Sequence, residues 1–271
     1  MHYTCMHGAG NSFVIIEEPC GRTSEDLSVL ARRLCTAFHT DGMIAVTPAE
    51  GADFGMLFYN ADGTKGEMCG NGARCLARYG VEHGLAPDPE HIRILATAGL
   101  VLARRITAEQ YEVRLNDPSV VDLSRRAPIP GESVPCAYVE LGDPGIPHAV
   151  VEVRPSAFEN LDALRERGRA LRFSPAFPKG ANVSFVCRTG ERRLRAITFE
   201  RGVEDFTLAC GTGCGAIALT QILAGKIPGE RVEIDMPGGR LAVSLRRDGD
   251  SARDLLLTGP TAVTAEGELE T

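Results

Sequence analysis

The 271-residue sequence contains no apolar run approaching the roughly 20 residues that a membrane-spanning helix needs. Its first residues, MHYTCMHGAGNSF, lack the charged and then apolar layout of a secretory signal. Low-complexity tracts are also missing, and 44% of the positions are hydrophobic, so the chain can bury a sizeable core. We therefore expect a globular protein of two domains in the cytoplasm.

Excess positive charge is lacking too. The chain has 29 Lys and Arg against 36 Asp and Glu, a formal net charge of −7, and its arginines are scattered among acidic residues. No basic stripe or aromatic-basic cluster is present for binding a phosphate backbone. We expect a small-molecule ligand and a homodimer, with no nucleic-acid or membrane partner.

Nine cysteines are present, but without a secretion signal their number does not indicate a disulfide framework. We interpret five of them as buried small hydrophobic residues, namely Cys5, Cys20, Cys35, Cys136 and Cys187. The other four lie in two segments that resemble each other.

The sequence contains an internal repeat. The segment YNADGTKGEMCGNGARCLARYGVEHG has a counterpart in FERGVEDFTLACGTGCGAIALTQILAG. Each shows a β-rich start, a polar stretch, Cys-Gly-x-Gly and an apolar-faced helical run that ends in glycine. The repeat predicts two related halves that meet near residues 116–120. We set the expected domains at 1–117, with about 260–271 packing back on them, and 118–259.

Sheet dominates the predicted secondary structure. Short β-rich runs lie at 43–47, 54–59, 92–97, 112–115, 183–186, 196–200, 232–235 and 241–245. Helical patterns cover 25–38, 71–83, 156–168 and 212–224, and Gly84 and Gly225 stand where C-terminal caps belong. The second and fourth helices are apolar over much of their surface, which is typical of a helix surrounded by sheet. The fold class is α/β (α+β), with two pseudo-symmetric halves, each a mostly antiparallel or mixed sheet wrapped around a central helix.

The cysteines that open the two repeated helices have the strongest chemical signal. Cys69 and Cys210 stand directly before a helix, where the partial positive charge of the first turn favours a thiolate. The glycines beside them let backbone N–H groups approach an anion such as a carboxylate. Removing an α-proton from an amino acid places negative charge on its carboxylate, and inversion requires a proton donor and acceptor on opposite faces. Two such cysteines therefore predict amino-acid epimerisation.

Other readings of these cysteines are less well supported. Cys69 with Cys75, and Cys210 with Cys214, lack the short knuckle spacing of a four-thiolate zinc site, so we expect no metal. A Cys-His hydrolase using His148 or His7 would not explain the duplication. Neither repeat has the GxGxxG or GxxxxGK[ST] spacing of a phosphate-binding loop.

Six segments in order, MHGAGNSF, NADGTKGEMCGNGARC, GIPHAVV, ANVSFV, ERGVEDFTLACGTG and MPGG, resemble the signature segments of the diaminopimelate epimerase family. The resemblance runs through nearly the whole chain. It implies two pseudo-symmetric halves with the active site in the cleft between them, and no cofactor. Pyridoxal phosphate is further disfavoured because Lys65, Lys179 and Lys226, the lysines available to bind it, lie in no recognisable cofactor setting.

The resemblance also implies roles for individual residues. Cys69 and Cys210 match the catalytic thiols, and His148 and Glu200 match the groups that adjust the protonation of one cysteine each. The residues that match the substrate contacts are Asn11, Asn60, Gly70, Asn71, Asn182, Glu200, Arg201, Gly211 and Thr212. Among these, backbone amides after each cysteine cradle the reacting carboxylate, and Arg201 can grip a distal carboxylate with two hydrogen bonds.

The implied reaction interconverts LL- and meso-2,6-diaminoheptanedioate for lysine and cell-wall precursor synthesis. Three residues depart from the family pattern: Ser12 replaces the usual Asp, Ile146 replaces a frequent Asn, and Phe206 interrupts a polar stretch. Since Ile146 removes a polar side chain from the distal pocket, a racemase of another amino acid stays open as an alternative. A carboxylate-based isomerase resembling the phenazine-pathway enzymes is disfavoured by the paired cysteines, and a non-enzymatic zinc module stays as a further alternative.

Overall fold

The protein is described by a computed structural model covering residues 1–18, 22–66 and 68–269. Cys20 and residues 270–271 of the expected return segment lie outside the described residues. The chain forms two compact units, Met1–Arg114 with Thr258–Thr271, and Leu115–Leu257.

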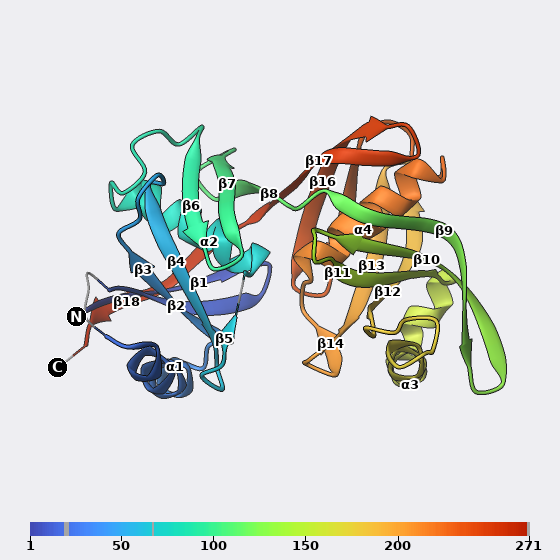
Figure 1. The fold of residues 1–271 in the computed structure, drawn as a ribbon, viewed down its shortest axis with the longest axis horizontal. Coiled ribbons are helices and arrows are strands. Elements are labelled where there is room, and N and C mark those ends of the chain that lie inside the picture. The colour runs from blue at the N-terminus through green and yellow to red at the C-terminus, as the bar shows by residue number, and fades with distance from the viewer. Residues whose placement is uncertain (19–21, 67, 270–271) are drawn as a thin grey trace. The chain divides into compact units, whose positions relative to one another are not determined.

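The N-terminal unit is built on one mixed sheet (Figure 1). Its strands are β1 (His2–Gly8), β2 (Asn11–Glu17), β3 (Gly42–Thr47), β4 (Phe54–Asn60), β5 (Lys65–Gly66), β6 (Ile92–Ala96), β7 (Gly99–Arg105), β8 (Gln110–Arg114) and β18 (Ala262–Glu268). The pairs β2–β3 and β4–β6 are parallel, whereas β18–β1, β1–β2, β3–β4, β4–β5, β6–β7 and β7–β8 are antiparallel.

Two helices cover opposite faces of this sheet (Figure 1). Helix α1 (Ser24–Phe38) starts with a capping box between Thr23 and Asp26, and its apolar stripe, which includes Leu27 and Leu34, packs over β2, β3 and β4. Helix α2 (Gly70–Glu82) lies on the other side, against β1, β2, β7 and β8. Most of its residues are buried, as the apolar composition of this segment predicts.

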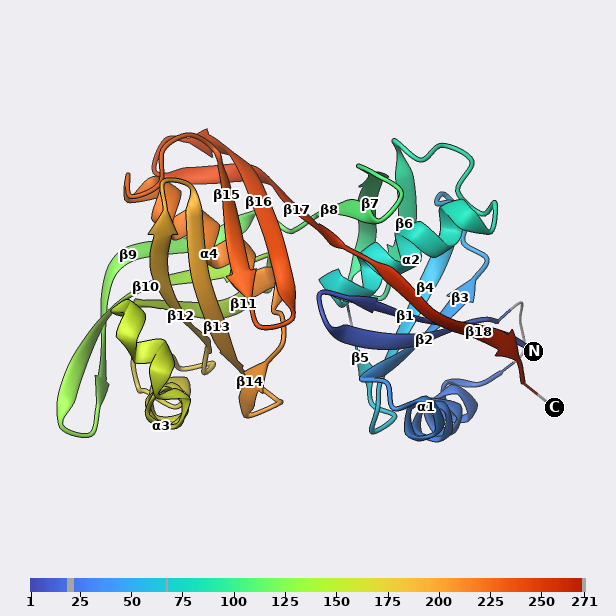
Figure 2. The ribbon, with the colours of Figure 1, turned by 180° about the vertical axis from the view of Figure 1, so that it is seen from behind.

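The C-terminal unit repeats the same plan. Its strands are β9 (Pro118–Ile129), β10 (Glu132–Leu141), β11 (Ile146–Glu152), β12 (Asn182–Gly190), β13 (Arg193–Glu200), β14 (Asp205–Thr207), β15 (Arg231–Met236), β16 (Gly239–Asp248) and β17 (Ser251–Pro260), which runs on into the N-terminal unit. Its helices are η1 (Pro155–Glu159), α3 (Leu161–Arg172) and α4 (Gly211–Leu223). Figure 2 shows α4 among the strands and α3 outside them.

The order and direction of the strands confirm the duplication. β10–β11 corresponds to β1–β2, the parallel pair β11–β12 to β2–β3, and the parallel pair β13–β15 to β4–β6. In the N-terminal unit the outer helix α1 lies between the parallel strands β2 and β3 in the sequence, and in the C-terminal unit α3 lies between β11 and β12. The central helices α2 and α4 each follow a short strand that ends just before a cysteine. The predicted fold class is therefore confirmed.

Three predicted helices lie within about one residue of the observed ones, but the helix predicted at 156–168 is wrong. Pro155 begins a 3-10 turn, and the Asn160 side chain then accepts a hydrogen bond from the Ala163 N–H at 3.1 Å and caps a separate helix. Gly84 and Gly225 follow the cap residues of α2 and α4 with φ of +71° and +69°, as expected of C-terminal caps.

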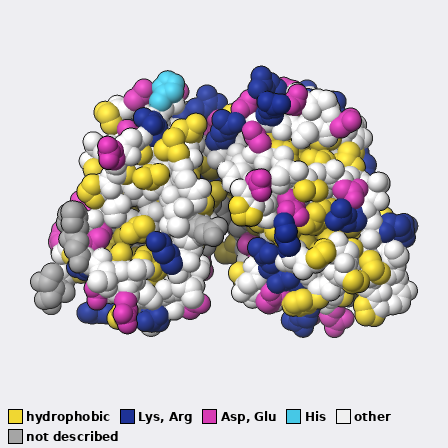
Figure 3. All heavy atoms as spheres, in the orientation of Figure 1, with side chains coloured by type: hydrophobic (Ala, Val, Ile, Leu, Met, Phe, Trp, Pro, Cys, Tyr) yellow, Lys and Arg dark blue, Asp and Glu magenta, His cyan; other side chains and the backbone are white. Residues whose placement is uncertain are grey.

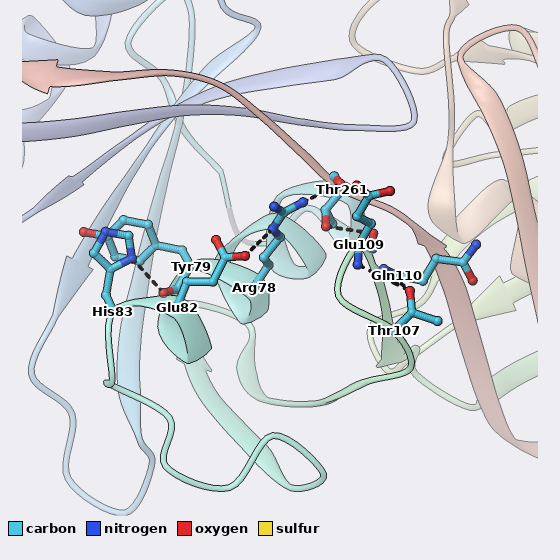
Figure 4. Close-up of polar contacts among 8 residues, drawn as sticks. All are labelled: Arg78, Tyr79, Glu82, His83, Thr107, Glu109, Gln110 and Thr261. Carbon is cyan, nitrogen blue, oxygen red and sulfur yellow. Dashed lines mark hydrogen bonds and ion pairs between the residues drawn. The ribbon is translucent and has the colours of Figure 1, made fainter.

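The C-terminal segment returns to the N-terminal unit and is held there by polar contacts (Figure 4). Arg78 on α2 donates to the carbonyl oxygen of Thr261 at 2.8 Å and to Glu82 at 2.8 Å. The Thr261 N–H and hydroxyl both donate to the carbonyl of Glu109. The N-terminal unit therefore contains residues from both ends of the chain.

Charged side chains of both signs are interspersed on the face drawn in Figure 3. The ion pairs Arg165–Asp205, Arg167–Glu132 and Arg193–Asp235 are examples of this mixing in the C-terminal unit. Within the described part of the chain, no helix has both the length and the apolar character to cross a membrane.

Candidate active site

Both repeated cysteines are the N-cap residues of the central helices. Cys69 precedes α2 with φ −132° and ψ 116°, and Cys210 precedes α4 with φ −114° and ψ 108°. The first helical hydrogen bonds run from Ala73 N–H to the Cys69 carbonyl and from Cys214 N–H to the Cys210 carbonyl. The backbone N–H groups of residues 70–72 and 211–213 therefore come before the first hydrogen bond of each helix. They include the amides that are predicted to hold the carboxylate.

The Cys69 sulfur lies beside the side chain of Asn11, which Asn71 also contacts. Its Sγ is 3.6 Å from Asn11 Oδ1, and Asn71 Nδ2 donates to the same oxygen at 3.4 Å. The structure thus brings together three predicted site residues from β2 and α2. Asn60, at the end of β4, instead donates to Thr64 Oγ1 at 2.9 Å.

An unpredicted carboxylate, Asp41, stands behind Asn11. Asp41 Oδ2 accepts from Asn11 Nδ2 at 2.9 Å, from the Ser12 N–H at 2.7 Å and from the Ser12 hydroxyl at 3.0 Å. Ser12, one of the departures from the family pattern, therefore serves as a double donor to Asp41.

Cys210 is 5% exposed and lies among polar groups of the C-terminal unit. The N–H of Gly213 points to its sulfur, and the Thr212 hydroxyl is 3.7 Å away. The thiol also donates to Glu200, which accepts a second hydrogen bond from Thr207. The structure thus brings the predicted residues Cys210, Thr212 and Glu200 together.

The expectation of a thiolate-favouring site is wrong for Cys210. Burial, followed by the negative charge of Glu200, raises its pKa well above the ordinary value. Hydrogen bonds from Gly213 and Thr212 oppose this rise without cancelling it. Burial likewise raises the pKa of Glu200. The direction of the shift at Cys210 is therefore set by burial and by the Glu200 carboxylate.

A side chain at position 213 would crowd the sulfur that this glycine faces. A Cβ there would lie 3.1 Å from Cys210 Sγ and 3.1 Å from Thr198 Oγ1. Thr198 is itself fully buried and paired with Ser184 at 2.9 Å, so it has little room to move.

His148 is fully buried on β11, and neither ring nitrogen has a hydrogen-bond partner among the described residues. Burial, with a smaller contribution from Arg201, lowers its pKa to about 3, so the ring is neutral. Asn182 lies opposite His148 in the parallel register. Its side chain donates to the Pro147 carbonyl at 3.2 Å and accepts from the Arg201 N–H at 2.9 Å. His148, Asn182 and Arg201 therefore form one group in the C-terminal unit.

Two of the three lysines weighed for pyridoxal phosphate lie in ion pairs. Lys179 pairs with Glu140 at 2.9 Å, and Lys226 pairs with Glu152. Across residues 1–18, 22–66 and 68–269, no three His, Cys, Asp or Glu side chains are grouped as metal ligands.

Three residues at these positions were missed by the sequence reasoning: Asp41, Arg74 and Thr207. Arg74 is fully buried and donates to Asn71 Oδ1 at 2.8 Å and to the Gly70 carbonyl at 3.2 Å. An arginine flanked by Ala73 and Cys75 one turn into the helix was a signal that it has partners inside. Asp41 and Thr207 carry no comparable signal, because Asp and Thr are common in turns and short strands.

A family model described as diaminopimelate epimerase matches residues 3–121 and 142–263. Among curated relatives named diaminopimelate epimerase, that of Methanothrix thermoacetophila is 36% identical over 282 residues, covering 98% of this chain and 95% of the relative. That of Chlorobaculum tepidum is 34% identical over 268 residues, covering 97% of this chain and 99% of the relative.

Solved structures share the fold at lower identity. A phenazine biosynthesis protein of the PhzF family from Bacillus anthracis has a TM-score of 0.78 at 16% identity, covering 100% of this chain and 99% of its own. A hydroxyproline epimerase from Agrobacterium vitis, solved with bound trans-4-hydroxy-L-proline, has a TM-score of 0.70 at 19% identity, covering 99% and 90%. The matching family model and the near full-length relatives, together with a cysteine at the start of each central helix, show that the chain belongs to the diaminopimelate epimerase family.

Proposed function

We propose that the protein is an isomerase that interconverts LL- and meso-2,6-diaminoheptanedioate without a cofactor. The observation that carries this proposal is the duplicated cysteine, placed as the N-cap of the buried central helix in both units of a chain from this family. Lysine and cell-wall precursor synthesis is the proposed setting.

The helix N-termini suit the charge that develops in this reaction. Deprotonation at an α-carbon shifts negative charge onto the adjacent carboxylate, and backbone N–H groups at the start of a helix stabilise such charge. In our proposal the amides of Gly70, Asn71, Gly211 and Thr212 hold the reacting carboxylate. Asn11, Asn60, Asn182 and Arg201 hold the remainder of the substrate.

Each unit supplies one acid/base thiol in the proposed mechanism. One cysteine removes the α-proton as a thiolate, and the other delivers a proton to the opposite face as a thiol, which inverts the centre. The pair then ends each turnover with its protonation reversed. The rate should follow a bell-shaped pH profile whose limbs belong to the pair.

Two side chains are proposed to adjust these protonation states. Glu200 accepts a hydrogen bond from Cys210 and raises its pKa, so it is placed to take up or return the proton of that thiol. His148 is neutral, and neither ring nitrogen has a partner among the described residues. We assign it to the other cysteine because of the family resemblance.

The direct test is conversion of LL-diaminopimelate by the purified, fully reduced protein, with the isomers separated by chiral chromatography. Formation of the meso isomer without added cofactor is expected, and Cys69→Ala and Cys210→Ala should each abolish it. Folded, reduced protein that leaves LL-diaminopimelate unchanged would contradict the proposal.

A racemase for another amino acid is the second candidate, and Ile146 is the observation that favours it. This apolar side chain is 37% exposed and precedes the Pro147–His148 pair on β11. Assays with amino acids that lack the distal carboxylate distinguish the two candidates, because the first requires that group and the second does not.

We also propose a cytoplasmic location and a homodimeric state. Cell fractionation tests the location. Light scattering on the purified protein tests the homodimer, which a monomer mass at micromolar concentration would contradict.

A further inference from the structure

We propose that Asp41 is a positioning residue, which fixes the amide of Asn11 so that its carbonyl oxygen faces the sulfur of Cys69. This inference deepens the proposed function and rests on it for the catalytic importance of Cys69. The orientation itself is a property of the N-terminal unit.

The Asp41 carboxylate can act only as an acceptor. Its Oδ2 receives Asn11 Nδ2 at 2.9 Å, and two further hydrogen bonds from Ser12 hold the carboxylate in place. The backbone at this corner is also paired, because the Asp41 N–H donates to the Ser12 carbonyl at 3.0 Å. The NH₂ group of Asn11 is thereby drawn toward Asp41, and the oxygen must point the other way.

The opposite end of the Asn11 amide is constrained by a donor. Arg74, which can only donate, binds Asn71 Oδ1 at 2.8 Å, and this directs Asn71 Nδ2 toward Asn11 Oδ1 at 3.4 Å. An acceptor-only group at one end and a donor-only group at the other fix the direction of every hydrogen bond between them. Asp41 makes the shorter of the two hydrogen bonds to the Asn11 side chain. Because Asp41 is exposed, it can be replaced without opening the core.

The orientation of the Asn11 amide determines which protonation state of Cys69 is favoured, because the amide oxygen lies 3.6 Å from the sulfur. An oxygen facing it accepts the S–H and favours the thiol, whereas a reversed amide would place N–H groups there and favour the thiolate. Charged and titratable groups that the structure brings to this sulfur include Asp41 through Asn11, Arg74 through Asn71, and the Cys75 thiol. Loss of Asp41 therefore changes both the local charge and the orientation, and a test must separate these two effects.

Asp41→Asn and Asp41→Ala make that separation. Asparagine removes the charge, but its Oδ1 can still accept from Asn11 and Ser12, whereas alanine removes both charge and acceptor. Asp88→Ala is the matched control, since Asp88 is an exposed loop carboxylate that accepts from the Glu90 N–H and from His91. All four proteins are compared as full chains.

The first readout is the pH dependence of iodoacetamide alkylation at Cys69, followed by mass spectrometry of its peptide. The second is kcat/KM for LL-diaminopimelate. We expect Asp41→Ala to shift the alkylation curve of Cys69 to lower pH and to lower kcat/KM about tenfold, the effect of roughly one hydrogen bond. Asp41→Asn and Asp88→Ala should both stay close to the parent protein.

An Asp41→Asn curve that coincides with that of Asp41→Ala would assign the effect to charge and overturn the proposal. An unshifted Cys69 curve in Asp41→Ala would overturn it as well, and a lowered melting temperature alone would then mark Asp41 as structural. If the parent protein does not turn over LL-diaminopimelate, the proposed function fails, while the alkylation series still decides the orientation.

Discussion

The two cysteines share a backbone setting but differ in their side-chain surroundings. Cys69 faces the amide oxygen of Asn11, to which Asn71 also donates, whereas Cys210 is buried beside the carboxylate of Glu200. Because one thiol meets a neutral acceptor and the other a titratable acid, the two should respond differently to pH. The duplication therefore preserved the helix ends and diversified the groups around them.

Glu200→Gln tests this difference at Cys210. The carboxylate raises the pKa of the thiol, so its removal should lower that pKa. Alkylation of the Cys210 peptide across pH 6–10, measured by mass spectrometry, reports the change. Glu166→Gln, at an exposed position on α3, is the control and should leave the curve in place. A Cys210 curve unchanged in Glu200→Gln would refute the assigned influence of the carboxylate.

His148 should make the fold sensitive to acid. Burial depresses its pKa to about 3 from 6.5, so the unfolded chain takes up a proton that the folded protein excludes. The stability that this group supports is fully present above pH 6.5. It is lost as the pH falls toward 3, at a limiting slope of about 1.4 kcal/mol per pH unit.

His148→Gln should flatten this slope, whereas His91→Gln, whose parent side chain is 82% exposed, should leave it intact. Urea unfolding between pH 4 and 7 measures this slope of the free energy of unfolding against pH. Equal slopes in the parent protein and His148→Gln would show that His148 is not excluded from protonation in the fold.

At the scale of the elements, α2 and α4 place the sulfurs, and glycine allows their approach. Gly213→Ala would put a methyl group 3.1 Å from Cys210 Sγ, in space that Thr198 also bounds. We expect kcat to fall about tenfold, because the Cys210 side chain has to shift away from the added methyl group. Gly190→Ala, where a Cβ meets only Arg193 Cβ at 3.3 Å, is the matched control. Full activity in Gly213→Ala would show that the sulfur position is not critical.

Much of this element plan could be predicted from the sequence, because α2 and α4 combine an apolar surface with glycine at both ends. The long strands β9 and β10 were missed, since β9 is largely exposed and its charged residues hide the alternation. The raised pKa of Cys210 could not be predicted either. It depends on burial and on Glu200, ten positions away, which only the folded unit brings to the sulfur.

At the scale of the molecule, each unit is a complete copy of one plan, and each supplies one cysteine. The chain enters the C-terminal unit at Leu115, and its last strand returns to pair with β1. A duplicated fold with one thiol per copy is suited to a reaction that needs one proton carrier on each face of a carbon. Neither copy alone would invert the centre in this account.

Solvent isotope exchange tests that claim most directly. LL-diaminopimelate is incubated with the protein in deuterium oxide, and the α-proton signal and the meso isomer are followed by NMR. The account predicts that each meso molecule carries a solvent deuteron at the inverted carbon, and that Cys69→Ala and Cys210→Ala each abolish inversion. Meso product formed with its original proton retained, or inversion that persists in either variant, would contradict the two-thiol account.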